Sequence, residues 1–340
     1  MCPTGVVIDP RYLQHDTGHG HPERPQRIAA LLDVVDSVSD RVRRIEPRLA
    51  DGEELALVHD GAYVDEVAAT RLRDWHSFDP DTPAGPLSYE TARLAAGGLL
   101  ALLDSIMDGS HRNGFAFVRP PGHHAERERA MGFCLFNNVA VGAAYLRRRY
   151  GLGRILILDW DLHHGNGTQH MFEQDPEVLF VSTHQYPFYP GTGGLDESGR
   201  RDGTGFTINL PLPAGCSDAE YLEVFDRVVL PIAHAYEPEM VLISAGFDAH
   251  VRDPLGGMHV TEAGFAAMAD RALEIAAAHA GGRCAAILEG GYDLSAICTS
   301  AQSVLARFAG DEAPLPATGP SRIEPLTERF RQHHGRYWRL

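Results

Sequence analysis

The amino-acid sequence predicts an α/β protein in which helices cover both faces of a parallel sheet. Short apolar runs of strand length alternate along the chain with longer segments in which apolar residues recur at helical spacing. Strands that are buried on both faces read as continuous apolar runs, and this pattern is typical of parallel sheets. Polar, Gly-rich segments follow most of these runs, as expected where loops at the strand ends carry function.

The individual elements follow from these patterns in chain order. Six apolar runs are predicted as strands, namely residues 5–8, 115–118, 154–158, 178–182, 240–244 and 284–288. Six segments with helical spacing are predicted as helices, namely residues 25–38, 88–107, 137–150, 218–235, 261–280 and 294–308. Pro22 and Pro25 suit the start of the first helix, and Thr261 is a usable cap for the fifth.

Length and charge limit the class of protein. The chain has 340 residues, of which 44% are hydrophobic, and this length is compatible with one large α/β domain or two smaller ones. The formal net charge is −16, and all 30 basic residues are Arg because the chain contains no Lys. Nucleic-acid binding depends on basic side chains that displace counterions from phosphates. We therefore expect no nucleic-acid partner.

Cysteine usage and hydropathy indicate the compartment. The five cysteines are widely spaced and form no CxxC pair, which argues against a disulfide framework and against a thiolate zinc site. The first residues lack a signal-peptide pattern, and no apolar stretch approaches the ~18 residues that span a bilayer. We expect a cytoplasmic protein with no membrane partner.

Chemistry-bearing residues gather after the predicted strands. Five segments follow them, namely RPPGHHA (119–125), DWDLHHGNG (159–167), THQ (183–185), GFDAH (246–250) and EGGYD (289–293). In an open parallel sheet, ligands bind beyond the carboxyl ends of the strands. The five segments are therefore predicted to converge on one site.

Asp161 and His163 are candidate metal ligands. In an extended segment residues two apart face the same side, so a carboxylate and an imidazole at this spacing can bind one ion. The alternative is that Asp161 caps a helix and His163 is a hydrogen-bonded buried side chain. Asp248, after the run 240–244, is the natural third ligand. Three protein ligands with an open position are the catalytic arrangement of zinc.

His123 and His124 are candidate proton-transfer residues. Adjacent residues face opposite ways in extended backbone, so both rings can enter one pocket only if the loop bends, as the preceding Pro-Pro-Gly run favours. A histidine pair beside a metal suits proton transfer from water to a leaving amine. The alternative, a surface-loop histidine, is the better interpretation for His15, His19, His21, His76, His111, His250, His279, His333 and His334.

Further polar and aromatic residues flank these positions. Asp159 and Asn166 are plausible partners that orient imidazole rings. Tyr292 could donate a hydrogen bond to a developing oxyanion, although a tyrosine at the edge of a turn is the alternative. Phe133 and Tyr189 could form an apolar slot, although aromatic residues more often belong to a core.

Six motifs in family order resemble the zinc-dependent histone deacetylase superfamily, which includes bacterial acetoin-utilisation proteins and acetylpolyamine amidohydrolases. They are RPPGHHA (119–125), GFCLFNN (132–138), LDWDLHHGNGTQ (158–169), FYPGTG (188–193), SAGFDAHVRDPLGG (244–257) and LEGGYD (288–293). The resemblance covers residues 5–308. It implies a single domain with the arginase/deacetylase fold, in which helices flank a central eight-stranded parallel sheet.

The resemblance also implies the catalytic roles. One Zn²⁺ ion would be held by Asp161, His163 and Asp248, and would activate water for attack on an acyl carbonyl. The implied roles of the catalytic residues are general base and acid for His124, its electrostatic neighbour for His123, and oxyanion donor for Tyr292, with Asp159 and Asn166 beside the histidines.

The resemblance implies a narrow substrate channel and monovalent cation sites. The channel residues are Gly132, Phe133, Tyr189, Leu255 and Gly290. A cation, usually K⁺, is implied at Asp159, Asp161, His163 and Ser182, and a second at Phe172, Asp175 and Val178.

Two positions refine the subgroup. Asn166 stands where class I enzymes have Asp and class II enzymes have Asn, so with HPERPQR (21–27) the chain resembles a bacterial class II type. Leu255 stands where the polyamine-specific branch has a Glu that selects a second cationic amine. Leu255 therefore favours acyl-lysine peptides or proteins, or generic N-acyl amines, over acetylpolyamines. Asp79 or Asp81, in a rim segment, could hold a substrate backbone or a cationic tail.

Alternatives remain at this point. An acetylpolyamine or small N-acetyl metabolite amidohydrolase is the nearest. An arginase-like enzyme with two Mn²⁺ ions needs more carboxylates than the segment 161–165 offers. A catalytically silent acyl-lysine-binding module would be favoured by loss of Tyr292 or of the histidine pair, but all of these residues are present.

Residues 1–310 are predicted as the catalytic domain, and residues 311–340 as a tail that packs on it or joins an oligomer contact. A dimer or tetramer is expected.

Overall fold

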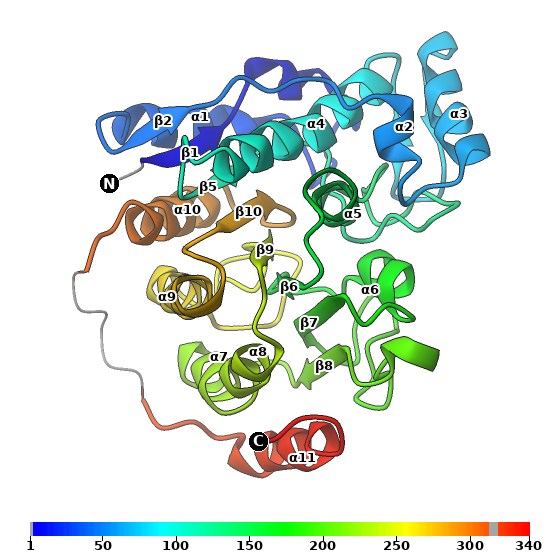
Figure 1. The fold of residues 1–340 in the computed structure, drawn as a ribbon. Coiled ribbons are helices and arrows are strands. Elements are labelled where there is room, and N and C mark those ends of the chain that lie inside the picture. The colour runs from blue at the N-terminus through cyan, green and yellow to red at the C-terminus, as the bar shows by residue number, and fades with distance from the viewer. Residues whose placement is uncertain (1–2, 313–318) are drawn as a thin grey trace.

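The computed structural model describes residues 3–312 and 319–340 and contains one eight-stranded parallel sheet (Figure 1). The strand order is β2-β1-β5-β10-β9-β6-β7-β8. The strands of this sheet are β1 (Thr4–Val7), β2 (Val42–Arg44), β5 (Asn113–Ala116), β6 (Ile155–Asp159), β7 (Val178–Gln185), β8 (Thr207–Leu212), β9 (Met240–Ala245) and β10 (Cys284–Leu288). A separate antiparallel pair is formed by β3 (His76–Ser77) and β4 (Pro83–Ala84). The expected α/β class and the single eight-stranded parallel sheet are confirmed.

Helices cover both faces of the sheet (Figure 1). On one face, α10 packs against both α1 and α9, and α9 also contacts α7 and α8. On the other face, α5 contacts both α4 and α6. The helices on the sheet are α1 (Gln26–Ser37), α4 (Ser88–Met107), α5 (Asn138–Tyr150), α6 (Asn166–Phe172), α7 (Asp218–Val224), α8 (Leu230–Tyr236), α9 (Glu262–His279) and α10 (Leu294–Phe308). Two further helices lie before α4, namely α2 (Gly52–Leu55) and α3 (Gly61–Ala69).

The core lies between the sheet and these helix layers. Every residue of β5, β6, β7, β9 and β10 is buried, which explains why these strands read as continuous apolar runs. The outer strand β2 differs, because Arg43 and Arg44 are exposed. Burial on both faces thus made the central strands recognisable in the sequence, whereas exposure of Arg43 and Arg44 left β2 without an apolar pattern.

Some predicted elements need correction. Residues 183–185 belong to β7 and not to a loop, so the THQ segment ends a strand. The single helix predicted over 218–235 is divided by a π-helical turn, Phe225–Val229, between α7 and α8. Pro231 follows this turn and has no N–H to bond the preceding turn of helix, so the backbone widens there. Strands β2 and β8 were not predicted individually.

Three histidines interpreted as surface-loop residues are buried. His15, His250 and His334 are 1%, 2% and 0% exposed. His15 Nδ1 lies 2.8 Å from the Ser88 hydroxyl, so a hydrogen bond offsets part of its burial. The sequence did not reveal this burial because each histidine lies outside an apolar run and has polar residues nearby.

The C-terminal segment carries α11 (Glu324–His334), which contacts α7 and the π-helical turn. Phe330 of α11 is fully buried, and Trp338 Nε1 donates to the Gly205 carbonyl at 2.7 Å. The part of the predicted tail at 313–318 lies outside the described residues. The division at residue 310 and a role in oligomer contact stay predictions.

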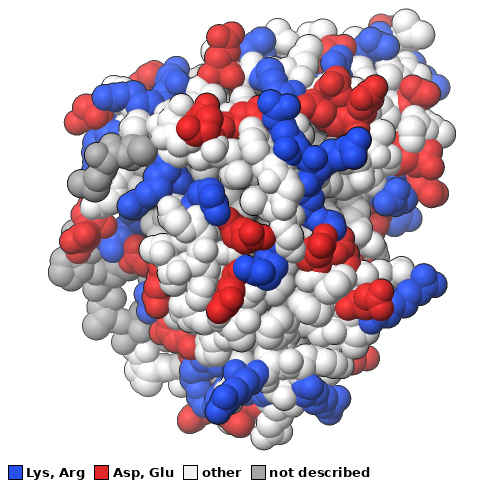
Figure 2. Space-filling view, in the orientation of Figure 1, with Lys and Arg blue, Asp and Glu red and all other residues white. Residues whose placement is uncertain are grey.

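Charges of both signs mix on the face of the molecule shown in Figure 2. Figure 2 shows Arg side chains interleaved with acidic side chains over the face it presents. Within residues 3–312 and 319–340, the helices lack the combination of length and apolarity that crossing a membrane requires. The cytoplasmic location stays a prediction.

Candidate active site

The predicted site residues come from loops at the carboxyl ends of adjacent strands. In the sheet, β6 lies beside β9, and β9 lies beside β10. The segments after these three strands carry Asp161 with His163, Asp248, and Tyr292 respectively. Strand order therefore brings residues far apart in the sequence to one edge of the sheet, as the parallel arrangement predicted.

Asp161, His163 and Asp248 form a candidate metal site. His163 Nδ1 lies 3.1 Å from Asp161 Oδ1 and 3.1 Å from Asp248 Oδ2, and one ligand atom of each residue lies within 4.8 Å of the others. Ligand atoms about 2.0 Å from a tetrahedral zinc ion are about 3.3 Å apart, so this spacing fits a shared ion. The bend at residues 161–163, rather than the extended backbone we expected, brings the two side chains of that segment together.

Electrostatics also favour a cation at this position. Asp161 and Asp248 are 1% and 0% exposed, so two carboxylates share a buried site. Burial lowers the pKa of His163, but these carboxylates outweigh burial and raise it to about 9. A divalent cation would compensate the two negative charges at the point where they face each other.

Main-chain groups fix both carboxylates. Gly290 N donates to Asp161 Oδ2 at 2.8 Å, and Leu162 N donates to Asp248 Oδ1 at 2.8 Å. A Cβ atom on Gly290 would lie 2.1 Å from Asp248 Oδ2, so only glycine allows this close approach. Gly290, predicted as a channel residue, thus also holds a ligand carboxylate.

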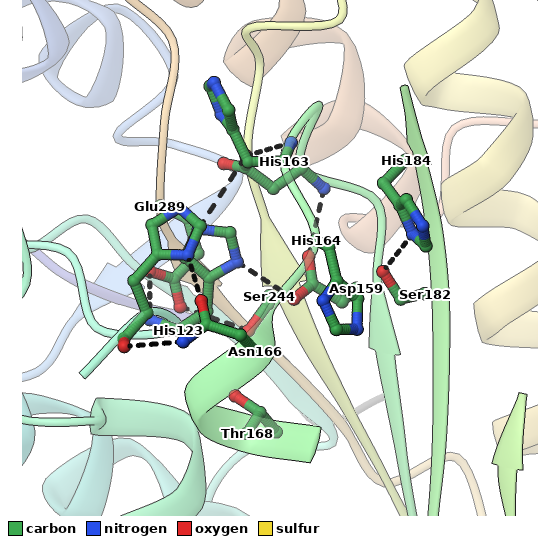
Figure 3. Close-up of polar contacts among 12 residues, drawn as sticks. His123, Asp159, His163, His164, Asn166, Thr168, Ser182, His184, Ser244 and Glu289 are labelled. Atoms are coloured by element: carbon green, nitrogen blue, oxygen red, sulfur yellow. Dashed lines mark hydrogen bonds and ion pairs between the residues drawn. The ribbon is translucent and has the colours of Figure 1, made fainter. Parts of the chain in front are cut away.

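His123 and His124 occupy a turn that directs both rings into the site, as the Pro-Pro-Gly run predicted. Ala125 N donates to the Gly122 carbonyl at 3.0 Å and closes this turn, and the two ring centroids are 4.0 Å apart. His123 Nδ1 lies 3.0 Å from Asp159 Oδ2 (Figure 3). Burial lowers the pKa of His123, but the carboxylates of Asp159 and Asp161 raise it to about 10. These carboxylates therefore favour the protonated, cationic form of the His123 ring.

His124 is neutral. Burial, together with the charges of His123 and His163, holds the pKa of His124 well below its ordinary value. His124 Nδ1 lies 2.7 Å from Asn166 Oδ1, which leaves Nε2 as the free ring nitrogen. A neutral imidazole with a free nitrogen can accept a proton, and the cationic ring of His123 beside it cannot.

A cavity of about 250 Å³ opens above these groups. Its lining consists of Asp81, Pro121, His123, His124, Gly132, Phe133, Cys134, His163, Phe188, Tyr189, Leu255, Gly290 and Tyr292. Burial raises the pKa of the Tyr292 hydroxyl well above its ordinary value, so this group stays protonated and can donate a hydrogen bond. All five predicted channel residues, Gly132, Phe133, Tyr189, Leu255 and Gly290, line this one cavity.

Aromatic side chains form the cavity walls. The Phe133 ring meets the Tyr292 ring edge to face at 5.8 Å, and the Tyr189 ring meets the His124 ring in the same way at 5.1 Å. Phe188, which was not among the predicted site residues, stacks on His163 at 5.6 Å. Its position next to Tyr189 in FYPGTG was the signal that could have found it.

The residues proposed for monovalent cations fall into two groups. Ser182 is buried beside Asp159, and its hydroxyl lies 2.9 Å from His184 Nδ1 (Figure 3). In the turn between α6 and β7, Asp175 N donates to the Phe172 carbonyl at 2.9 Å, and Val178 N donates to the Asp175 carbonyl at 3.4 Å. Both K⁺ sites stay predictions.

Two buried ionisable residues behind the site, Glu289 and Arg27, were not predicted from the sequence. Glu289 is fully buried, and its Oε2 accepts hydrogen bonds from Gly122 N at 2.6 Å and His123 N at 3.1 Å. Arg27 Nε donates to the Gly291 carbonyl at 2.6 Å, and its guanidinium lies 5.0 Å from the Tyr292 ring centre. Two features of the sequence could have indicated them: the acidic residue at the start of EGGYD, which is Glu289, and the charged residues Glu23 and Arg27 within HPERPQR.

Comparison with known proteins identifies the family. A model of the histone deacetylase domain matches residues 21–308. Histone deacetylase 15 of Arabidopsis thaliana is 45% identical over 332 residues, which cover 94% of this chain and 59% of that protein. A probable deacetylase of Archaeoglobus fulgidus is 39% identical over 319 residues, which cover 90% of this chain and 86% of that protein.

Two further matches bear on fold and substrate. The crystal structure of the HDA15 HD domain superimposes with a TM-score of 0.93 at 40% identity, covering 99% of this chain and 96% of that one. Polyamine deacetylase HDAC10 of Homo sapiens is 42% identical over 312 residues, which cover 88% of this chain and 46% of that protein. The chain thus spans only about half of some longer relatives.

The fold and the site define a hydrolase with a candidate metal-binding triad beside a histidine pair. The chain belongs to the histone deacetylase family, and the relatives compared above are named as deacetylases.

Proposed function

We propose that this protein removes acetyl or other acyl groups from acyl-lysine-like N-acyl amines with the help of one zinc ion. The observation that carries the proposal is the convergence of the triad Asp161, His163 and Asp248 with neutral His124 at a cavity with aromatic walls. A cavity of about 250 Å³ suits a narrow side chain that carries an amide.

Different side chains have different roles in the proposed reaction. Asp161, His163 and Asp248 would hold zinc, which supplies Lewis-acid chemistry by polarising an acyl carbonyl and lowering the pKa of water. His124 accepts a proton at Nε2 from the attacking water and later delivers it to the leaving amine. The positive charge of His123 stabilises negative charge that develops nearby.

Tyr292, which lines the same cavity, completes the arrangement. Its protonated hydroxyl donates a hydrogen bond to the oxygen that becomes negative as water adds to the carbonyl. The rings of Phe133 and Tyr189 exclude water from the acyl chain, which strengthens these electrostatic interactions.

The experiment that tests the function is a substrate panel. Purified protein is incubated with acetyl-lysine peptide, trifluoroacetyl-lysine peptide, a longer acyl-lysine peptide, acetylputrescine and acetylspermidine, with and without a chelator. We expect turnover of the acyl-lysine peptides that the chelator abolishes and Zn²⁺ restores. Absence of chelator-sensitive turnover on every member of the panel would contradict the proposal.

Replacing Tyr292 by Phe is expected to lower kcat roughly 100- to 1,000-fold, because the oxyanion loses one donor. The ring and its edge-to-face contact with Phe133 remain, so KM for an acetyl-lysine peptide should change little. Steady-state kinetics with zinc measured on the same sample check this result. Loss of zinc in parallel with activity would show that the assigned role is wrong.

Replacing Leu255 by Glu is expected to shift selectivity toward acetylpolyamines. Leu255 lines the cavity, and a carboxylate there would attract the distal ammonium of acetylspermidine. We expect the ratio of kcat/KM for acetylspermidine over acetyl-lysine peptide to rise about 10-fold, which corresponds to about 1.4 kcal/mol. Leu255→Gln is the control of matched shape without charge. An equal rise in that control would exclude the charge as the cause.

Two observations favour the acetylpolyamine alternative. Asp81 also lines the cavity. A carboxyl at this position can meet a cationic tail, and a relative named as a polyamine deacetylase is 42% identical. The substrate panel separates the two, since preference for acetylspermidine over every acyl-lysine peptide in the unmodified protein would favour the alternative.

The substrates, the oligomeric state and the K⁺ sites are also proposals. Acyl-lysine peptides or proteins, or small N-acyl amines, are the proposed substrates, and a homodimer or homotetramer is the proposed assembly. K⁺ is proposed at the two groups of residues around Ser182 and Asp175. The net charge of −16 would steer basic substrates toward the protein by long-range attraction.

A further inference from the structure

A chain of hydrogen-bonding side chains connects His124 with the protein surface. Asn166, at the start of α6 (Figure 3), lies with its Oδ1 2.7 Å from His124 Nδ1. Asn166 Nδ2 donates to Glu126 Oε1 at 2.6 Å. On the surface, His170 Nδ1 lies 2.8 Å from Glu126 Oε1, and the His170 side chain is 39% exposed. The chain therefore runs from the buried ring through an amide and a carboxylate to an exposed imidazole.

The surroundings of Asn166 fix the orientation of its amide. Besides Glu126 Oε1, Asn166 Nδ2 faces the His124 carbonyl at 3.3 Å and Met131 Sδ at 3.5 Å, and all three atoms are acceptors. A rotated amide would direct its carbonyl oxygen at these acceptors, which repel it. The contact with Glu126 is the shortest and carries a charge, so it contributes most to the preference.

The orientation of the amide determines the tautomer of His124. An amide oxygen can only accept, so Nδ1 must carry the ring proton and Nε2 must be free. With the amide rotated, Asn166 Nδ2 would donate to Nδ1, and the ring proton would move to Nε2. A ring protonated at Nε2 cannot accept a proton from water in the cavity.

We propose that Glu126 is a positioning residue that holds Asn166 in the orientation required for His124 to act as a base. The inference rests on the proposed role of His124. It adds a residue that belongs neither to the metal triad nor to the cavity lining.

The backbone of Glu126 is held independently of its side chain. Glu126 N donates to the Arg129 carbonyl at 2.9 Å, and the Glu126 carbonyl faces His59 Nδ1 at 3.0 Å. The next residue toward the site, Ala125, contacts α6 closely, because a Cβ atom on Gly167 would lie 2.2 Å from its carbonyl oxygen. Changing the Glu126 side chain should therefore leave the loop and α6 in place.

The test compares two side chains of similar size at position 126. Glu126→Gln keeps an oxygen that can accept from Asn166, whereas Glu126→Leu removes every acceptor. On an acetyl-lysine peptide we expect Glu126→Leu to lower kcat roughly 10- to 100-fold with KM unchanged, and Glu126→Gln to recover most of the loss. Glu128→Gln, an exposed glutamate of the same loop, is the matched control for loss of one charge. Equal kcat in wild type and Glu126→Leu, or equal loss in Leu and Gln variants, would overturn the inference.

A second measurement reports the tautomer without substrate. Nitrogen-15 NMR of histidine side chains in the zinc-loaded protein distinguishes Nδ1–H from Nε2–H, and the His124 signals are identified by their loss in His124→Ala. We expect Nδ1–H in wild type and Glu126→Gln, and an added Nε2–H population in Glu126→Leu. An unchanged Nδ1–H signal in Glu126→Leu would overturn the inference.

The two measurements separate the inference from the proposed function. If His124→Ala kept full activity, the role of His124 as the base would be wrong, whatever Glu126 does. If His124→Ala lost activity while Glu126→Leu kept both kcat and tautomer, the catalytic role would stand and the positioning role of Glu126 would fall.

Discussion

Replacing His124 by Ala is expected to lower kcat on an acetyl-lysine peptide by roughly 100- to 10,000-fold, the usual range for loss of a general base. His124 is the neutral ring of the pair, because burial and the charges of His123 and His163 hold its pKa well below its ordinary value. His123 cannot substitute for it, since the carboxylates beside His123 keep that ring protonated.

Metal content distinguishes this role from metal binding. His124 does not belong to the triad, so His124→Ala should keep zinc as measured by elemental analysis. The comparison variant His163→Ala should lose both zinc and activity, because it removes one of three ligands. If His124→Ala lost zinc to the same extent, His124 would have to be regarded as part of the metal site.

Replacing Glu23 by Ala is expected to lower the free energy of unfolding by about 3 to 5 kcal/mol, the range for breaking a buried ion pair. Glu23, Arg27 and Arg119 are all fully buried. Glu23 Oε2 accepts from Arg119 Nη2 at 2.7 Å, and Glu23 Oε1 accepts from Arg119 Nε and from Arg27 Nη1. Without the carboxylate, two buried guanidinium groups keep their charges and lose their counter-ion.

Urea unfolding followed by circular dichroism checks this result. Asp36→Ala is the control, because Asp36 forms an ion pair with Arg44 at the surface, where such pairs contribute at most about 1 kcal/mol. A loss for Glu23→Ala no larger than for Asp36→Ala would contradict the expectation. Activity should fall as well, because Arg27 also holds the Gly291 carbonyl beside Tyr292.

The pH dependence of this contribution has a defined sign. Burial raises the pKa of Glu23, but Arg119 and Arg27 outweigh burial and lower it from 4.5 to about 2. A lowered folded-state pKa means that the contribution is fully present above pH 4.5 and is lost as the pH falls toward 2. The difference in stability between wild type and Glu23→Ala should therefore shrink across this interval.

Much of the fold could be predicted because strands that are buried on both faces appear in the sequence as continuous apolar runs. The central strands are buried on both faces, so β6, β9 and β10 appear as apolar runs. β2 has three residues, two of them exposed Arg, and β8 contains Pro211 at the edge of the sheet, so neither has a clear pattern. Their place in the sheet was expected only from the family resemblance.

In the site, too, some residues could be predicted from their closeness in the sequence, whereas others come together only in the folded protein. Asp161 and His163 lie two residues apart, and His123 and His124 are adjacent, so their proximity is a local property of the chain. Glu126 is just as close to His124 in the sequence, but its link through Asn166 depends on α6 packing against the turn. Phe188 and Glu289 likewise acquire their contacts only when the loops meet.

The sequence by itself determined the central strands, the long helices, most of the polar loops at strand ends and the residue types that can carry deacetylase chemistry, because these depend on neighbours along the chain. Only the tertiary structure decided which loops meet. Asp248 reaches His163 because β9 lies directly beside β6, although two strands separate them in the sequence. Strand order is set by how helices pack on both faces of the sheet, and residue spacing does not encode it locally.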